Sequence, residues 1–207
     1  MLSEGRTGLI SAGDGSVNPI RLNSVGAVVV SRERGQYTEN ALLSKIFVCS
    51  TAVGGVAPGT ALSTTPPIAL FNPLSSRVEL SVLKTSTGYV SGTLGAGSIL
   101  YAYYTPQTTV PTGGAELVSV CSRLGSVKGV GRVFQGSTLA GTPLILRAAF
   151  NLGAALATTA VGLSNCQDAV EGAYIVPPGS CFVIQGVTAA GSTPLVTLAI
   201  MWEEISI

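Results

Sequence analysis

From residue 36 to the end of the chain, short apolar segments alternate with turns rich in Gly, Pro, Ser and Thr, and no segment keeps a helical period. Segments of this length between turn residues are typical of β-strands. They cover residues 45–50, 68–72, 77–84, 97–105, 117–121, 130–134, 144–150, 173–176, 181–187 and 195–205. Because no helical crossovers separate them, we predict an all-β fold: an antiparallel β-sandwich that is jelly-roll-like, with an extended N-terminal arm.

Two of these segments carry apolar residues at every second position, most clearly the segment over 77–84. Every second residue from Val78 to Val82 is apolar, and the same holds from Val196 to Trp202. This period of two is expected when one face of a strand is buried and the other is not. Residues 151–163 contain enough alanine for one short helix, but their glycines and threonines disfavour it.

The first 35 residues differ from the rest, because glycine and proline interrupt any period before the apolar run at 27–30. We predict an extended arm with a lead-in strand over residues 1–35 and a jelly-roll-like sandwich domain over residues 36–207. The N-terminus has neither the basic nor the apolar stretch of a signal peptide, so we expect the protein to stay where it is made.

Charged side chains make up only 10% of the chain, against about 25% in a typical soluble domain. These are too few charged side chains to cover the surface of a soluble monomer. We therefore expect partner subunits to bury much of that surface. The net charge of +1 and the lack of a basic cluster disfavour nucleic-acid binding. The most apolar stretch, 144–163, contains Arg147 and Asn151, which disfavours a membrane-spanning helix.

Histidine is absent, which removes the commonest metal ligand and the base of Ser-His and Cys-His catalytic pairs. Glu203 and Glu204 are adjacent on a predicted strand, so they point to opposite faces and cannot act jointly as acid and base. We expect them to face solvent or a rim, and we expect Asp168 and Glu171 to lie in an ordinary turn. We therefore predict no catalytic residue, no metal site and no cofactor.

We interpret the cysteines and the glycine-rich pieces as parts of the fold and not as binding sites. The four cysteines stand singly, at Cys49, Cys121, Cys166 and Cys181. We expect reduced and mostly buried thiols, although a disulfide stays possible. The pieces 11–16 and 125–131 lack the Lys-Ser/Thr of a P-loop, and Asp14 lacks the further carboxylates of an EF-hand, so both pieces are predicted to be turns.

Tyrosines cluster in the predicted strand over 97–105, with Tyr101 and Tyr103 on one face and Tyr104 on the other. We interpret these residues and Trp202 as aromatics that pack at the sheet or at a subunit interface, where a ring with a polar tip is useful. A stacking platform for sugars or bases is the alternative interpretation of the tyrosines.

Three stretches carry a resemblance to a known family. They are RGQYTEN at 34–40 ahead of KIF at 45–47, TALSTTPP at 60–67 running into ALFNP at 69–73, and VPPG at 176–179 followed by FVIQG at 182–186 and WEEI at 202–205. Together they resemble the virion structural proteins of tailed bacteriophages, over most of residues 25–207.

This resemblance implies a jelly-roll-like sandwich that forms a homo-oligomer, most simply a trimer. It implies a capsid decoration or cement protein that bridges subunits of the major capsid protein in the virion, after assembly in the host cytoplasm. The arm residues expected to face the capsid are Leu2, Arg6, Leu9, Ile10, Pro19, Ile20, Arg21 and Leu22. The alternatives are a tail or baseplate head that binds a host receptor glycan, and a carbohydrate-active enzyme.

Overall fold

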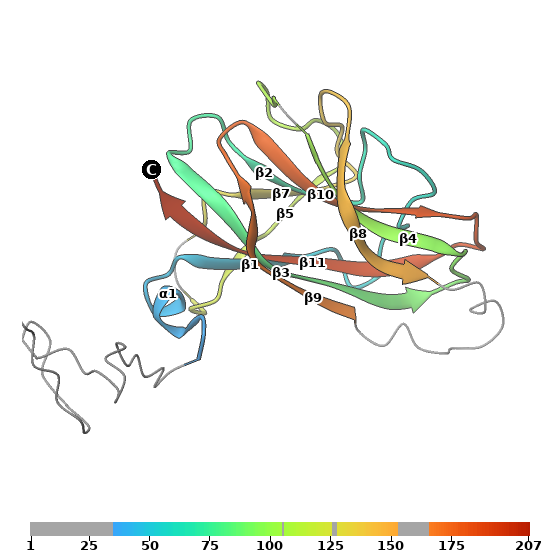
Figure 1. Ribbon diagram of the computed structural model, residues 1–207, viewed down its shortest axis with the longest axis horizontal. Helices are drawn as coiled ribbons and strands as arrows, with labels where there is room; N and C mark the ends of the chain where they lie inside the picture. Colours follow the sequence, from blue (N-terminus) through green and yellow to red (C-terminus); the bar gives the residue numbers. More distant parts are fainter. Residues whose placement is uncertain (1–34, 105, 126–127, 153–165) are drawn as a thin grey trace, which may run out of the picture. The chain divides into compact units, whose positions relative to one another are not determined.

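The computed structural model describes residues 35–104, 106–125, 128–152 and 166–207 (Figure 1). The chain divides into two units, Met1–Glu39 and Asn40–Ile207. The strands form two antiparallel sheets, and the described part of the chain contains one short helix. This architecture confirms the predicted all-β sandwich.

The short helix α1 (Thr38–Leu42), which the sequence did not predict, precedes the strands. The described strands are β1 (Ile46–Ser50), β2 (Ile68–Asn72), β3 (Val78–Ser91), β4 (Gly97–Tyr104), β5 (Ala115–Leu117), β6 (Val120–Cys121), β7 (Arg132–Gln135), β8 (Leu144–Leu152), β9 (Cys166–Val176), β10 (Ser180–Thr188) and β11 (Leu195–Ser206).

The strand order is that of a jelly roll. One sheet has the order β6-β1-β11-β3-β9 and the other has the order β5-β7-β2-β10-β4-β8. Four antiparallel pairs are nested along the chain: β1 with β11, β2 with β10, β3 with β9, and β4 with β8. The first and third pairs lie in one sheet, and the second and fourth pairs lie in the other. This arrangement is an eight-stranded jelly roll, as predicted.

The three remaining strands form an insertion between β4 and β8. In this insertion β6 extends the first sheet beside β1, where Val48 faces Val120, while β7 extends the second sheet beside β2, with β5 at its edge. The prediction of one strand over residues 117–121 is wrong, because the chain leaves the second sheet after Leu117 and joins the first sheet at Val120.

The space between the sheets is filled by apolar side chains. The inward residues of β11 include Leu198, Ile200 and Trp202, which have no exposed surface, and this confirms the predicted alternation. The indole of Trp202 stacks on the Phe47 ring, with the ring centroids 5.9 Å apart. Fully burying one such side chain is worth roughly 1.5–3 kcal/mol. The space between the sheets is therefore a core of packed apolar side chains.

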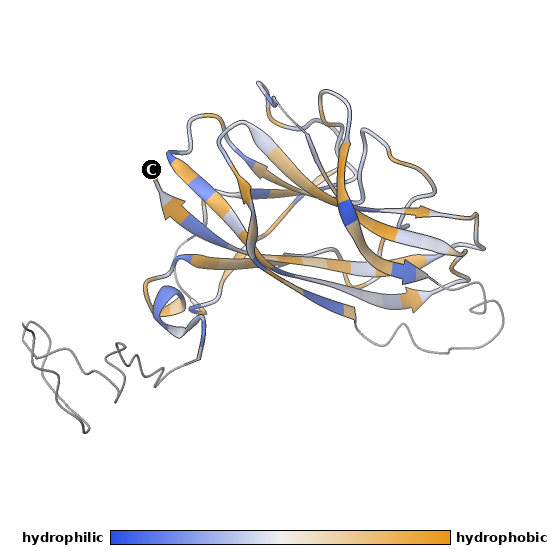
Figure 2. Ribbon diagram, in the orientation of Figure 1, coloured by the Kyte–Doolittle hydropathy of each residue, from blue (hydrophilic) through white to orange (hydrophobic). Residues whose placement is uncertain are grey.

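A second apolar cluster covers the outer face of the second sheet. Along β2, Ile68 and Leu70 point to the space between the sheets, whereas Phe71 points to the other side. There it lies in one cluster with Leu139, which comes from the loop between β7 and β8. Both faces of β2 are consequently buried, and Figure 2 shows apolar residues along the strands of both sheets.

Two strands are longer than the sequence predicts. β3 continues to Ser91, and β9 begins at Cys166. The inward positions of the added part of β3 are taken by Thr85 and Thr87, which are buried. Small polar residues at buried positions hide the alternation that identifies a strand.

The carboxylates Asp168 and Glu171 lie within β9, so the prediction that they occupy a turn is wrong. Glu171 and Gly172 have positive φ angles of 49° and 82°, at a point where the register between β9 and β3 shifts. The bulge keeps the strand paired on both sides of it. The predicted lead-in strand at 27–30 and most of the segment 151–163 lie outside the described residues.

Candidate functional site

The four aromatic residues predicted to pack or to form an interface are placed differently from one another. Tyr101, Tyr104 and Trp202 have no exposed surface within the chain itself. The Tyr104 hydroxyl donates a hydrogen bond to the backbone oxygen of Ser63. Only Tyr103 is partly exposed, at a cleft described below. Three of the four are therefore buried in the apolar clusters of the fold, and a sugar cannot stack on them.

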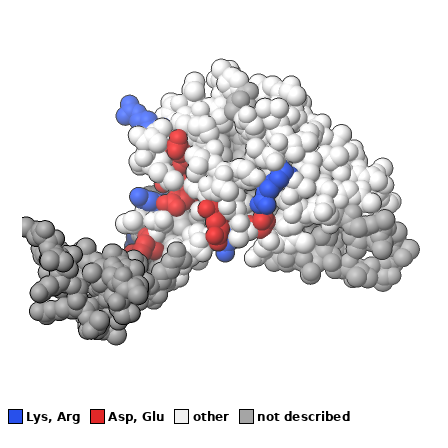
Figure 3. All heavy atoms as spheres, viewed as in Figure 1, with Lys and Arg blue, Asp and Glu red and all other residues white. Residues whose placement is uncertain are grey.

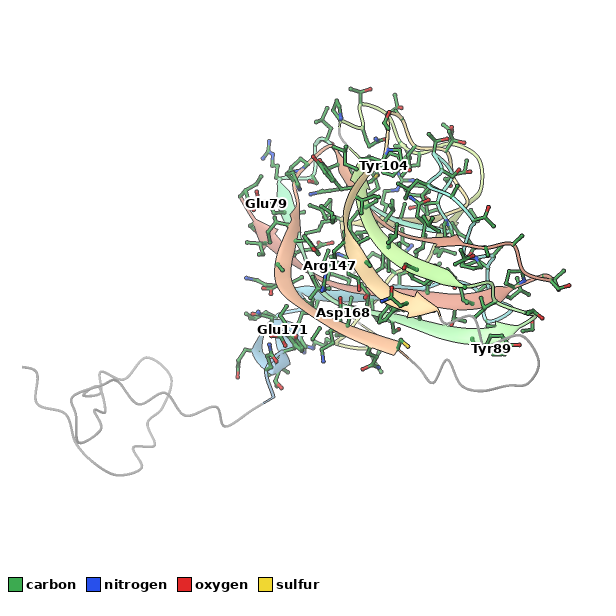
Figure 4. The ribbon with its side chains drawn as sticks, turned by 45° about the vertical axis from the view of Figure 1, so that its right-hand side comes forward. Glu79, Tyr89, Tyr104, Arg147, Asp168 and Glu171 are labelled. Carbon is green, nitrogen blue, oxygen red and sulfur yellow. The ribbon has the colours of Figure 1, made fainter. Side chains whose placement is uncertain are left out.

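A polar cluster joins the two sheets beside β8 and β9. The Tyr101 hydroxyl donates to the Asp168 carboxylate at 2.8 Å and shares a hydrogen bond with Thr85. Arg147 forms an ion pair with Asp168, and Figure 4 shows these two side chains together. The Arg147 guanidinium also lies 5.3 Å from the centroid of the Tyr101 ring.

This polar cluster is built for structure. Burial raises the pKa of Tyr101 well above its ordinary value, so the phenol stays protonated. Asp168 is bound to both Tyr101 and Arg147, on strands of the opposite sheet. We conclude that the cluster clamps the two sheets together.

An apolar cleft of about 300 Å³ opens between β8 and β9. Its lining includes Tyr103, Leu146 and Ile175, together with Tyr174 and Phe182. The rings of Tyr174 and Phe182 stack with their centroids 6.0 Å apart. The cleft can accept apolar side chains of a partner, because its walls offer mainly carbon surface.

The strands on either side of this cleft lie at sheet edges. β8 and β9 end their respective sheets, and no described strand pairs with their outer edges. Leu144, Ile145 and Ile175 are 52%, 56% and 43% exposed. Exposed apolar strand edges are sites where another chain adds to a sheet, and contiguous apolar surface marks an interaction site. We call the cleft and these three residues the β8–β9 side.

The β8–β9 side was not predicted from the sequence, although one signal was available. Residues 144–146 are three consecutive apolar residues, and a strand with only one buried face should alternate. The structure shows that Leu144 and Ile145 are exposed while Leu146 packs against the core. The predicted capsid-facing residues of the arm lie outside the described residues.

The pair Glu203 and Glu204 also departs from the sequence interpretation. Glu204 does not simply face solvent: its carboxylate accepts backbone hydrogen bonds from Val130 at 2.7 Å and from Gly131 at 2.8 Å. The Trp202 indole N–H lies 3.4 Å from the same carboxylate oxygen. Glu204 therefore holds the insertion against β11.

The described residues contain no group of three or more His, Cys, Asp and Glu side chains that could hold a metal ion. None of the four cysteines forms a disulfide, and Cys49, Cys121 and Cys181 are buried. Within the described ranges, no helix has the length and apolarity to cross a membrane.

Comparison with known proteins gives few matches. No family model and no curated protein matches the chain. Among solved structures, a chain of the KBV activated particle at acidic pH is 8% identical, with 100% of this chain and 90% of that chain covered and a TM-score of 0.25. A chain of Sacbrood virus of honeybee is 13% identical, with 97% and 80% covered and a TM-score of 0.24. Similarity at this level is no basis for assigning a function.

Proposed function

We propose that this protein is a structural subunit of a virus particle, without enzymatic activity. Within that class we propose a capsid decoration protein of a phage, which forms a homo-oligomer, most simply a trimer, and bridges major capsid subunits. The β8–β9 side carries this proposal, because it combines an apolar cleft with two strand edges that no described strand pairs with. Proteins normally protect such strand edges, and a neighbouring subunit can do so by packing against them.

Jelly rolls are used in viral capsids, in lectins and in cupins. A metal-binding jelly roll needs ligands inside, whereas this interior is filled by side chains such as Phe182 and Trp202 and the chain has no histidine. A sugar-binding site needs polar groups that converge on a cleft, whereas the β8–β9 cleft is mainly apolar. Assembly into a particle is the use that this surface supports best.

The proposed mechanism is mechanical. An oligomer bound across several shell subunits resists their separation, because separation would expose the area buried at each contact. A standard interface buries about 1,600 Å² in total, and several linked contacts raise the overall affinity through effective concentration. No side chain needs to change its protonation state or react.

The test is binding of the purified chain to capsids that lack it, measured by co-sedimentation after light scattering has given its oligomeric state. We expect saturable binding to capsids and none to host cells. The double variant Ile145→Asp, Ile175→Asp places charge on the β8–β9 side, and we expect it to bind at least about tenfold more weakly, a loss of about 1.4 kcal/mol or more.

The matched control is Leu124→Asp, which replaces a residue that is 82% exposed and follows β6, at the opposite edge of the first sheet from β9. This variant should bind capsids as the unmodified chain does, and thermal melts should show that all variants are folded. If the chain ignores capsids and binds host cells, the decoration role is wrong and a receptor-binding head replaces it.

A further inference from the structure

Three loops meet at one end of the sandwich: residues 51–59, 92–96 and 189–194. Val56 in the first loop exchanges two backbone hydrogen bonds with Val196, at 2.8 and 2.9 Å. The second and third loops are joined by a bond of 3.0 Å from the Thr93 N–H to the Ser192 oxygen. We call this surface the loop end; it lies away from the β8–β9 cleft, at the far ends of β3 and β10.

The loop end carries no charged residue. The loops 51–59, 92–96 and 189–194 contain no Asp, Glu, Lys or Arg, and neither does the whole stretch 172–202. On β8 and β9 the charges closest to it are Arg147 and Asp168, which neutralise each other as an ion pair. Figure 3 shows the charged side chains toward the left and centre of the view, while the described atoms on the right are uncharged.

The low overall charge of the protein does not by itself explain this distribution. The opposite end, where β2 turns into β3, carries Arg77 and Glu79, and the insertion adds Glu116 and Arg132 as a bidentate ion pair at 2.7 and 2.6 Å. Charge is therefore present on the molecule but absent from one end.

The loops 92–96 and 189–194 of the loop end are also in close contact, and most of their residues are small. A Cβ atom on Gly95 would lie 1.9 Å from the Ala189 oxygen, so the two loops touch backbone to backbone. Exposed residues here include Ala96, Ala190 and Ser192. Ala and Gly lose no side-chain entropy on burial, and surfaces without charge are the cheapest to desolvate. Burying such a surface against another protein therefore costs little free energy.

Rotational symmetry explains why the covering protein should be a second copy of this chain. Close to a rotation axis each residue lies near its own symmetry mates, so any charge there meets the same charge and is repelled. A charge-free end avoids this repulsion. We infer that the loop end surrounds the axis of a cyclic homo-oligomer. This inference rests on the proposed structural role, in which copies assemble, and it adds the surface that they use.

The test introduces a charge at the loop end by substitution and then mixes variants of opposite charge. Ser192→Asp and Ser192→Lys are each made in the full chain, with Val53→Asp and Val53→Lys as a second pair, since Val53 is 93% exposed. We expect each variant alone to need at least about a tenfold higher concentration to assemble, because like charges meet at the axis. A mixture of the Asp and Lys variants should recover assembly as mixed oligomers, measured by native mass spectrometry.

The control is the same pair of substitutions at Ser75, an exposed serine in the turn between β2 and β3, at the opposite end. Ser75→Asp and Ser75→Lys should assemble as the unmodified chain does. The inference is overturned if the unmodified chain stays monomeric, if the Ser192 and Val53 variants assemble normally, or if mixing fails to restore assembly. Capsid binding is read separately, so an oligomer that ignores capsids contradicts the decoration role and leaves this inference standing.

Discussion

Glu204 shows how one side chain can hold an insertion to a sandwich. Its carboxylate binds the N–H groups of Val130 and Gly131, which are not paired in any sheet. We expect Glu204→Ala to lower the free energy of unfolding by about 1–3 kcal/mol, because two backbone donors lose their acceptor. Glu204→Gln keeps an acceptor oxygen and should lose less.

Urea denaturation of these Glu204 variants measures the difference. Glu203→Ala is the control, because this neighbour points to the opposite face of β11 and should change stability by less than about 0.5 kcal/mol. Equal losses for Glu203→Ala and Glu204→Ala would contradict the role assigned to Glu204.

The thiols give a prediction on pH. Burial raises the pKa of Cys49 from 9.0 to about 11 and that of Cys181 to about 12. Because the folded pKa values lie above the unfolded one, their contribution to stability is complete below pH 9.0 and is lost as pH rises through about 11 for Cys49 and about 12 for Cys181. Melting temperatures should fall across that range.

Alkylation of the native protein tests the same burial directly. Cys166 is partly exposed, whereas Cys49 and Cys181 are buried. Iodoacetamide at neutral pH should therefore modify Cys166 first and reach the other two only after unfolding, as read by mass spectrometry. Rapid labelling of Cys181 in the folded protein would show that β10 is not buried as described.

At the scale of elements, the loop pair at 92–96 and 189–194 depends on glycine. Gly95→Ala would place a methyl group 1.9 Å from the Ala189 oxygen, and Gly191→Ala would place one 1.9 Å from the Thr93 oxygen. Overpacking against backbone costs typically 1–3 kcal/mol, so we expect each variant to lose about that much stability in urea denaturation.

The control for the loop pair is Gly54→Ala, because a Cβ atom there meets nothing within 4 Å. Its stability should change by less than about 0.5 kcal/mol. If Gly95→Ala were no less stable than Gly54→Ala, the two loops would not be in the close contact described.

The strands were predicted where apolar residues alternate or form a short run between turns, and they were missed where neither pattern is present. The observed bounds of β2 match the predicted ones, because its run of four apolar residues and one asparagine lies between Pro67 and Pro73. The first half of β9 was missed because it contains few apolar residues. The β8–β9 side and the loop end were also not predicted, because they depend on which strands end each sheet. That order is set by pairings between residues far apart in the chain, such as Leu80 with Val176.

At the scale of the whole molecule, the four nested strand pairs of the jelly roll are formed by residues that follow the N-terminal arm. The first strand of the jelly roll begins at Ile46, and its partner β11 ends at Ser206. Deleting residues 1–30 should therefore leave the sandwich folded, with the unfolding midpoint changed by less than about 2 °C. Circular dichroism and thermal melts measure this.

The same deletion should weaken attachment to capsids, because we propose that the arm contacts the capsid in addition to the β8–β9 side. A chain that folds on binding can wrap a large surface, and losing one of two linked contacts should lower affinity by at least about tenfold. A chain whose first 30 residues are shuffled keeps length and charge and serves as the control; it too should bind weakly. If the truncated chain fails to fold, the arm contributes to the core; if it folds and binds capsids fully, the β8–β9 side suffices for attachment.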